Sequence, residues 1–173
     1  MIAAFPRTRL LAIDPTRQGF AYVLLESQIL IDWGLVHAGV GVDAAARRLD
    51  ELLLRFNPQT ILIEHQTLQS KRSSRARELL VSIEVLGLSH GITVERIERS
   101  GVRATFPESK TKHGIALALT DRYPELRTWR PRRRKPWMSE DERMNIFDAL
   151  ALAEAFLLTT DHYKPSNTDA YAT

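Results

Sequence analysis

The sequence contains no cysteine, which excludes disulfide bonds and thiolate metal sites and is typical of a reducing compartment such as the cytoplasm. No apolar run reaches the roughly 18 residues that a membrane-spanning helix needs. The N-terminal segment meets Asp14 too early to be typical of a secretory signal. Glycine-rich phosphate loops, Ser–His–Asp signatures and internal repeats are also absent.

What remains is an ordinary globular composition. Of the 173 residues, 44% are hydrophobic and 26% are charged, enough to bury one sizeable core and too apolar for a disordered chain. We expect a single domain over residues 1–160 and a flexible C-terminal tail over residues 161–173.

The net charge of +3 conceals an uneven distribution. Residues 101–137 carry ten cations and three anions, whereas residues 138–173 carry two cations and seven anions. A basic block beside an acidic one indicates a polyanionic partner.

Periodicity predicts an α/β chain. Short apolar runs predict five strands, at residues 10–13, 19–26, 29–36, 60–64 and 92–98. Helical spacing predicts helices at residues 42–56, 74–90, 107–123 and 139–159. The last helix is expected to begin in a capping box of Ser139 and Glu142. This order predicts a five-stranded mixed sheet, with three antiparallel meander strands followed by parallel strands and with helices on both faces.

Three carboxylates stand out against these elements. Asp14 directly follows the apolar run LLAI, and Glu64 directly follows ILI. If the two strands are parallel and adjacent, both side chains emerge at the sheet end where open sheets bind ligands. Asp148 lies in a helix that is apolar on nearly every side, where a lone carboxylate is costly unless a charge offsets it.

Such a convergence has a chemical meaning. Carboxylates about 4 Å apart repel by roughly 4 kcal/mol per pair at an effective dielectric constant of about 20. A divalent cation reverses the sign, and all-oxygen ligands suit Mg²⁺ or Mn²⁺. Each residue also has a plainer interpretation: Asp14 before Pro15 as a turn, Glu64 as a strand reaching solvent, and Asp148 as the partner of an arginine such as Arg143.

The strings LLAIDPTRQGFAY, ILIEHQ and NIFDALALAEA, in this order, resemble the RuvC family of Holliday junction resolvases within the ribonuclease H-like superfamily. The similarity covers roughly residues 9–159. It implies a ribonuclease H-like fold and metal-dependent hydrolysis of DNA phosphodiesters in four-way junctions, with no membrane role. It also implies a homodimer with the helix at 74–90 as its interface, in the cytoplasm or on the nucleoid.

The resemblance implies roles for particular residues. The metal ligands would be Asp14, Glu64, Asp148 and Asn145, holding Mg²⁺ or Mn²⁺, two ions per site. Lys110 and Lys112 resemble the family's lysines near the scissile phosphate and complete the catalytic set.

The chain departs from the family pattern at several places. Asn145 stands where an Asp or His is usual, and Asp141, one further turn away, is a weaker candidate ligand. After Glu64 come His65, Gln66, Thr67 and Leu68 in place of the family's aromatic residue. His65 is expected on the opposite face of its strand, as a structural histidine. Where the family pattern has a glycine-rich loop, this chain has only the short segment at residues 105–112.

A basic segment, RTWRPRRRKPW at residues 127–137, precedes the helix that carries Asp148. Its prolines favour an extended backbone whose cations follow phosphates, and its tryptophans suit stacking on unpaired bases. The alternative is a solvated loop whose tryptophans pack on the protein. The predicted nucleic-acid-binding residues are Lys71, Arg72, Arg75, Arg103, Lys110, Lys112, Trp129, Arg130, Arg132, Arg133, Arg134 and Lys135.

Three functional hypotheses therefore follow. The first is a junction resolvase. The second is a nuclease for forks, flaps or RNA–DNA hybrids, favoured by the absent aromatic residue and the shortened loop. The third is a non-catalytic nucleic-acid-binding module, favoured by Asn145.

Overall fold

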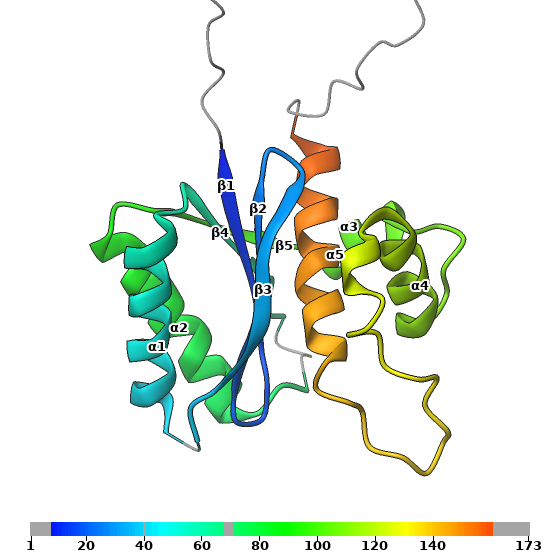
Figure 1. Ribbon diagram of the computed structural model, residues 1–173. Coiled ribbons are helices and arrows are strands. Elements are labelled where there is room, and N and C mark those ends of the chain that lie inside the picture. Colours follow the sequence, from blue (N-terminus) through cyan, green and yellow to red (C-terminus); the bar gives the residue numbers. More distant parts are fainter. Residues whose placement is uncertain (1–7, 40, 68–70, 161–173) are drawn as a thin grey trace, which may run out of the picture.

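A single five-stranded sheet with helices on both faces organises the chain (Figure 1). The computed structural model describes residues 8–39, 41–67 and 71–160. The strand order is β3-β2-β1-β4-β5. The predicted fold class is confirmed, whereas the predicted tail at 161–173 lies outside the described residues.

The strands pair as the sequence predicts. β1 is antiparallel to β2 and parallel to β4, while β2–β3 is antiparallel and β4–β5 is parallel. The parallel pairing of β1 with β4 meets the condition set for Asp14 and Glu64. The bounds are β1 Arg9–Pro15, β2 Gly19–Glu26, β3 Ile29–His37, β4 Thr60–Glu64 and β5 Thr93–Ile97.

The helices divide between the two faces of the sheet (Figure 1). On one side lie α1 Val42–Phe56 and α2 Ser74–Ser89. On the other lie α3 Arg99–Thr105, α4 Lys112–Arg122 and α5 Met144–Thr159, with a short 3-10 turn, η1, at Pro124–Leu126. No helix within the described ranges has both the length and the apolar character needed to cross a membrane.

The residues at several turns and helix ends explain why the strands and helices stop there. Ser27 and Gln28 both have positive φ, 48° and 73°, as a two-residue turn between antiparallel strands requires. Asn57 ends α1 in the left-handed region, with its N–H donating to the Leu53 carbonyl. Gly91, with φ 67°, follows α2 as its predicted stop.

Alternation along β1 separates two cores. Leu11 and Ile13 pack with the α1 and α2 side chains, whereas Leu10 and Ala12 pack with α5. The same alternation continues to Asp14, which therefore points toward the α5 side.

The predicted helix at 107–123 is wrong in its first part. Residues 99–105 form α3 instead, and α4 begins only at Lys112. The reason is the cap: the Thr111 hydroxyl accepts the Gly114 N–H at 3.1 Å. The Pro107-Glu108 pair, which suggests a helix start, lies in the turn between the two helices.

The predicted start of the last helix at Ser139 is also wrong, because α5 begins at Met144 without a side-chain cap. The capping box does not form. The Glu142 carboxylate lies 3.7 Å from His37 Nδ1, and Asp141 accepts the Arg143 backbone N–H at 2.9 Å.

A buried polar contact ties α4 to α5. Glu154, 3% exposed, accepts the Tyr123 hydroxyl at 2.5 Å and pairs with Arg122. Burial, and then the bond to Glu154, raise the pKa of Tyr123, so its hydroxyl stays protonated and donates. This contact holds the α4 helix against the helix that carries Asp148.

We predict that Leu62→Ala, in the interior strand β4 two residues before Glu64, lowers the free energy of unfolding by about 2–5 kcal/mol, because it leaves a cavity in the α5-side core. The matched control is Leu54→Ala on the exposed side of α1, where the change should stay within about 0.5 kcal/mol. Urea unfolding of both variants measures the difference. Equal losses would contradict this placement of the core.

Candidate active site

Two carboxylates meet at the ends of β1 and β4. Ala12 pairs with Leu62 in the parallel register, so two further residues bring Asp14 beside Glu64. Both Ala12 and Leu62 face the core beneath α5, and alternation keeps Asp14 and Glu64 on that side. Asp14 is buried, with 3% of its surface exposed.

These side chains lie in a large cleft of about 1110 Å³. The carboxyl ends of β1 and β4, the segment before α2, and α3, α4 and α5 all contribute to its walls. The structure brings the four predicted metal ligands into this one cleft: Asp14, Glu64, Asn145 and Asp148.

Arg72 occupies the space between the two strand-borne carboxylates. Its Nη2 donates to Asp14 Oδ1 at 2.7 Å and also to Glu64 Oε2. Burial alone would lower the pKa of Arg72, but Asp14 and then Glu64 raise it on balance, so the guanidinium stays charged. The sequence suggested Arg72 only as a phosphate-binding residue.

The first turn of α5 reaches the same pair. Asn145 Nδ2 donates to Asp14 Oδ2 at 2.6 Å. Both oxygens of Asp14 are thus engaged, one by a cation and one by an amide. Because the Asn145 amide nitrogen is used in this bond, the side-chain carbonyl oxygen of Asn145 is the atom that can bind a ligand.

Asp148, one turn further along α5, has a lysine as its partner. Lys112 Nζ donates to Asp148 Oδ2 at 2.7 Å and to Glu140 Oε1 at 2.8 Å. The alternative pairing of Asp148 with Arg143 is wrong, because Arg143 donates to Asp141 Oδ2 at 2.6 Å. That contact engages Asp141 with its sequence neighbour.

The pKa values reflect this crowding. Burial, and then the negative charge of Asp14, raise the pKa of Asp148 to about 6, against the opposing effect of Lys112. For Lys112, burial lowers the pKa, but Asp148 and Glu140 together raise it on balance. The bond from Arg143 lowers the pKa of Asp141. Burial and the neighbouring charge of Asp14 thus both disfavour the ionised form of Asp148.

The donor set suits a hard divalent cation, because every candidate ligand offers oxygen. In the described part of the chain, however, no three His, Cys, Asp or Glu side chains converge on one point as a ready metal site. The amino and guanidinium groups of Lys112 and Arg72 take up the carboxylate oxygens instead. The residues fit a metal ion in kind, provided that these cations move.

The other residues predicted to bind nucleic acid lie partly inside the cleft and partly outside it. Lys71, Arg103 and Lys110 line the cleft. Arg75 instead donates to the carbonyls of Thr16 and Gly39, at 3.0 and 2.9 Å, and so ties α2 to the loops beside it.

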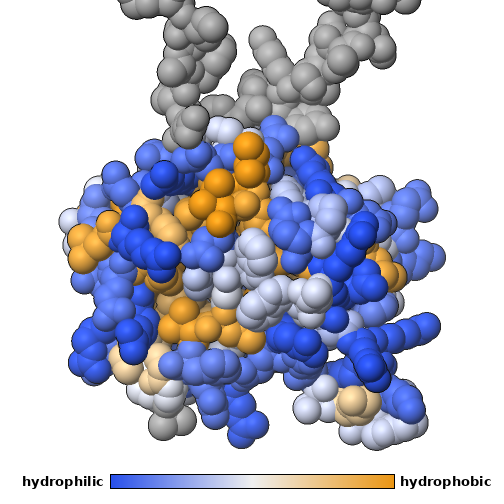
Figure 2. Space-filling model, viewed as in Figure 1, coloured by the Kyte–Doolittle hydropathy of each residue, from blue (hydrophilic) through white to orange (hydrophobic). Residues whose placement is uncertain are grey.

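The basic loop between η1 and α5 extends from the body at the same end as the cleft (Figure 1). Trp129 is half-buried against the α5-side core, and Arg130 donates to Thr120 Oγ1 at 2.8 Å, so the start of the loop packs on the protein. The residues from Arg132 to Lys135 are exposed, and the surface there is mainly hydrophilic (Figure 2). Trp137 is 78% exposed, with Lys135 Nζ 5.4 Å from its ring centroid.

Several cleft residues escaped the sequence analysis. Arg99 and Glu98 line the wall formed by α3, which was not predicted, and Glu140 is the second partner of Lys112. His65, expected on the far face, lines the cleft because β4 ends one residue earlier. The acidic block before α5 was the one available signal for Glu140.

Comparison with known proteins places the fold. No family model matches the sequence, and a search of curated proteins finds no match. Among solved structures, RuvC of Thermus thermophilus in complex with a Holliday junction substrate is similar, with a TM-score of 0.64 and 16% identity over 91% of this chain and 98% of that one. A second T. thermophilus RuvC structure has a TM-score of 0.62 and 16% identity over 88% of this chain and 96% of that one.

The resolvase of Fowlpox virus, in complex with Holliday junction DNA, is also similar. Its TM-score is 0.58, with 12% identity over 87% of this chain and 99% of that one. The expected RuvC-like, ribonuclease H-like fold is therefore confirmed across nearly the whole chain.

We predict a distinctive pH dependence for the metal-free protein, because the pKa of Asp148 is raised from 3.8 to about 6. A carboxyl with a raised pKa stabilises the fold while it is protonated, and this stability is lost as pH rises through about 6. Relative to Asp148→Asn, wild type should lose on the order of 3 kcal/mol of unfolding free energy between pH 4 and 7. Urea denaturation in EDTA measures both proteins, and parallel pH profiles would rule out the raised pKa.

Proposed function

We propose that this protein is a metal-dependent, structure-selective endonuclease that hydrolyses phosphodiester bonds in branched DNA, with the four-way junction as its substrate. The observation that carries the proposal is the cleft at the ends of β1 and β4. Its floor holds Asp14, Glu64, Asp148 and Asn145, and its walls carry cations. The fold shared with two junction-bound resolvases supports the choice of substrate.

The acidic floor would hold Mg²⁺ or Mn²⁺, two ions by resemblance to the RuvC family. When bound, such ions activate water and neutralise charge on the phosphate. The raised pKa of Asp148 supports this assignment, since a bound cation would offset both of its causes, burial and the neighbouring charge of Asp14.

The walls would position the DNA. Lys71, Arg103 and Lys110 line the cleft without an ion pair to its carboxylates among the described contacts, and they are suited to phosphate oxygens. Lys112 would stabilise charge at the scissile phosphate once it is released from Asp148, with Glu140 as its remaining partner. A DNA substrate would place the protein in the cytoplasm or on the nucleoid.

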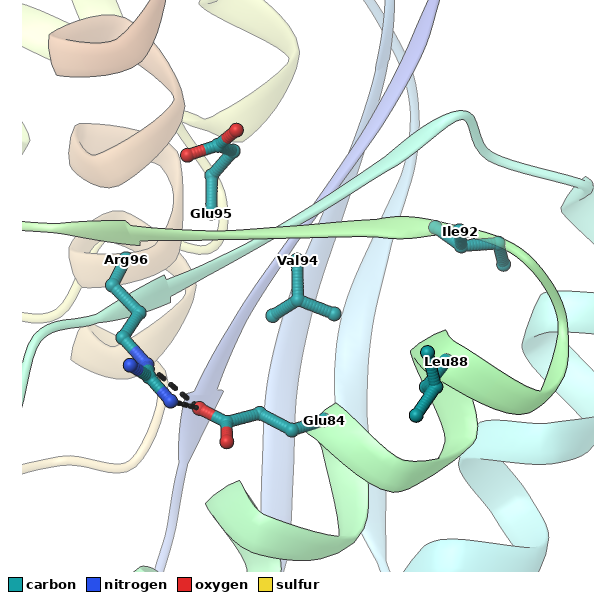
Figure 3. Close-up of a pocket in the computed structure, with 6 residues that line it drawn as sticks. All are labelled: Glu84, Leu88, Ile92, Val94, Glu95 and Arg96. Atoms are coloured by element: carbon teal, nitrogen blue, oxygen red, sulfur yellow. Dashed lines mark hydrogen bonds and ion pairs between the residues drawn. The ribbon is translucent and has the colours of Figure 1, made fainter.

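Junction resolution needs two symmetric cuts, so we infer a homodimer with two sites. The exposed side of α2 supports it as the interface: Val81, Val85 and Leu88 form an apolar stripe at helical spacing. Beside this stripe lies an open cleft of about 510 Å³, lined by Leu88, Ile92 and Val94 and by the Arg96–Glu84 ion pair (Figure 3).

A second candidate substrate is a fork, a flap or an RNA–DNA hybrid. The described residues after Glu64 are His65, Gln66 and Thr67, and none of them is an aromatic ring of the kind that opens a junction in the RuvC family. The third reading, a binding module without catalysis, depends on Asn145 in place of an acidic ligand.

We predict that Asp14→Asn and Asp148→Asn each abolish cutting while junction binding is retained or tightened, since less negative charge faces the phosphates. Labelled four-way junction, fork, RNA–DNA hybrid and linear duplex are incubated in Mg²⁺ or Mn²⁺. Asp43→Asn, exposed on α1 at the opposite face, should cut like wild type.

The cutting pattern separates the candidates. Paired symmetric nicks in the junction support a dimeric resolvase, and cutting confined to forks or hybrids supports the second candidate. Binding without cutting by wild type in either metal, or wild-type turnover by either site variant, would falsify the nuclease assignment.

We predict that replacing Arg132, Arg133 and Arg134 with Ala lowers the slope of log affinity against log salt by about 3, because each arginine that reaches a phosphate releases about one counterion. Fluorescence anisotropy with junction DNA at several salt concentrations gives the slope. The matched control removes the same charge from α1, by Ala at Arg47, Arg48 and Arg55. Identical slopes in the two triple variants would remove the loop from the DNA-binding surface.

A further inference from the structure

The position of Arg72 carries a consequence beyond DNA binding. Arg72 precedes Ser73, whose hydroxyl caps α2, and its side chain is only 21% exposed. Its Nη2 contacts Asp14 Oδ1 and Glu64 Oε2 at the same time. These are two of the oxygens that a metal ion bound between the strand ends would need.

The three carboxylates on the floor of the cleft already have partners within the chain. Arg72 joins Asp14 to Glu64, Asn145 engages the other oxygen of Asp14, and Lys112 engages Asp148. A divalent ion between the strand ends and the guanidinium of Arg72 cannot occupy the same position, both because of their size and because like charges repel there.

The two internal cations differ in how readily they can leave. Lys112 is 43% exposed and already shares its charge with Glu140, so it keeps a partner if it releases Asp148. Arg72 has no carboxylate partner other than Asp14 and Glu64 among the contacts of the described residues. Its release therefore leaves a charge without a partner in the free protein, and the cost falls on metal binding.

We propose that Arg72 is a built-in competitor of the metal ion: it holds the strand-end carboxylates together in the metal-free protein and is displaced when a divalent ion binds between them. The inference rests on the proposed metal-dependent function and adds that this chain's own arginine sets the metal affinity. Arg72 thus stabilises the empty site and weakens the loaded one.

The test is titration of metal-free protein with Mn²⁺ by isothermal calorimetry, without DNA. Arg72→Gln should bind Mn²⁺ about tenfold more tightly, or bind an additional ion, because no cation has to leave the carboxylates. Arg47→Gln removes the same charge from an exposed position on α1, outside the cleft, and should stay within about twofold of wild type. An affinity and stoichiometry for Arg72→Gln equal to those of wild type or of Arg47→Gln would overturn the proposal.

Stability gives an independent readout. In EDTA, Arg72→Gln should melt at a lower temperature than wild type, because two neighbouring carboxylates lose their cation. Added Mn²⁺ should raise its melting temperature by more than it raises that of wild type. A smaller rise would count against competition.

If Arg72→Gln does not fold without metal, a measurement on the wild-type protein tests the proposal instead. The Arg72 side-chain NMR signal, assigned by its loss in Arg72→Lys, should shift on saturation with Mg²⁺ as the guanidinium leaves the two carboxylates. A signal unchanged by saturating Mg²⁺ overturns the proposal. If neither wild type nor Arg72→Gln binds Mn²⁺, the proposed metal-dependent function is wrong as well. If both bind Mn²⁺ equally, only the proposed competition by Arg72 is wrong.

Discussion

Repulsion between two carboxylates at the ends of neighbouring parallel strands is the constraint that shapes this molecule. The register of β1 and β4, together with the alternation of side chains, leaves Asp14 and Glu64 side by side under α5. Like charges about 4 Å apart cost roughly 4 kcal/mol at an effective dielectric constant of about 20, and burial adds to this. The surrounding elements each bring a group that offsets this charge.

The offsetting groups come from three separate helices or their approaches. The segment before α2 brings Arg72, the first turn of α5 brings Asn145, and α4 brings Lys112 to Asp148. The buried contact of Glu154 with Tyr123 and Arg122 holds α4 in the position that makes the last of these pairs. The acidic floor and the basic walls are therefore parts of one electrostatic arrangement, which suits both a divalent cation and a phosphate backbone.

The accuracy of the sequence analysis follows the strength of the local signals. Strands that are apolar throughout and helices that end at Asn57 or Gly91 were predicted correctly, because burial and backbone conformation are encoded within a few residues. The helix α3 and the first residues of α4 and α5 were not; α3 is short and has no buried residue to reveal a periodicity. Pro107 and the Ser139–Glu142 pair carried start signals, but α4 begins after the Thr111 cap and α5 begins only at Met144.

Residue order alone was sufficient for the fold class and the strand pairing, because these depend on alternation, helical period and recurring motifs. Tertiary structure decided the partners. Arg72 and Asn145 contact the two carboxylate oxygens of Asp14 from positions 58 and 131 residues away in the sequence. No local sequence pattern encodes such distant contacts. Only the packing of α2 and α5 against the sheet determines that Arg72 lies between the carboxylates, while Arg143 pairs with Asp141 instead of Asp148.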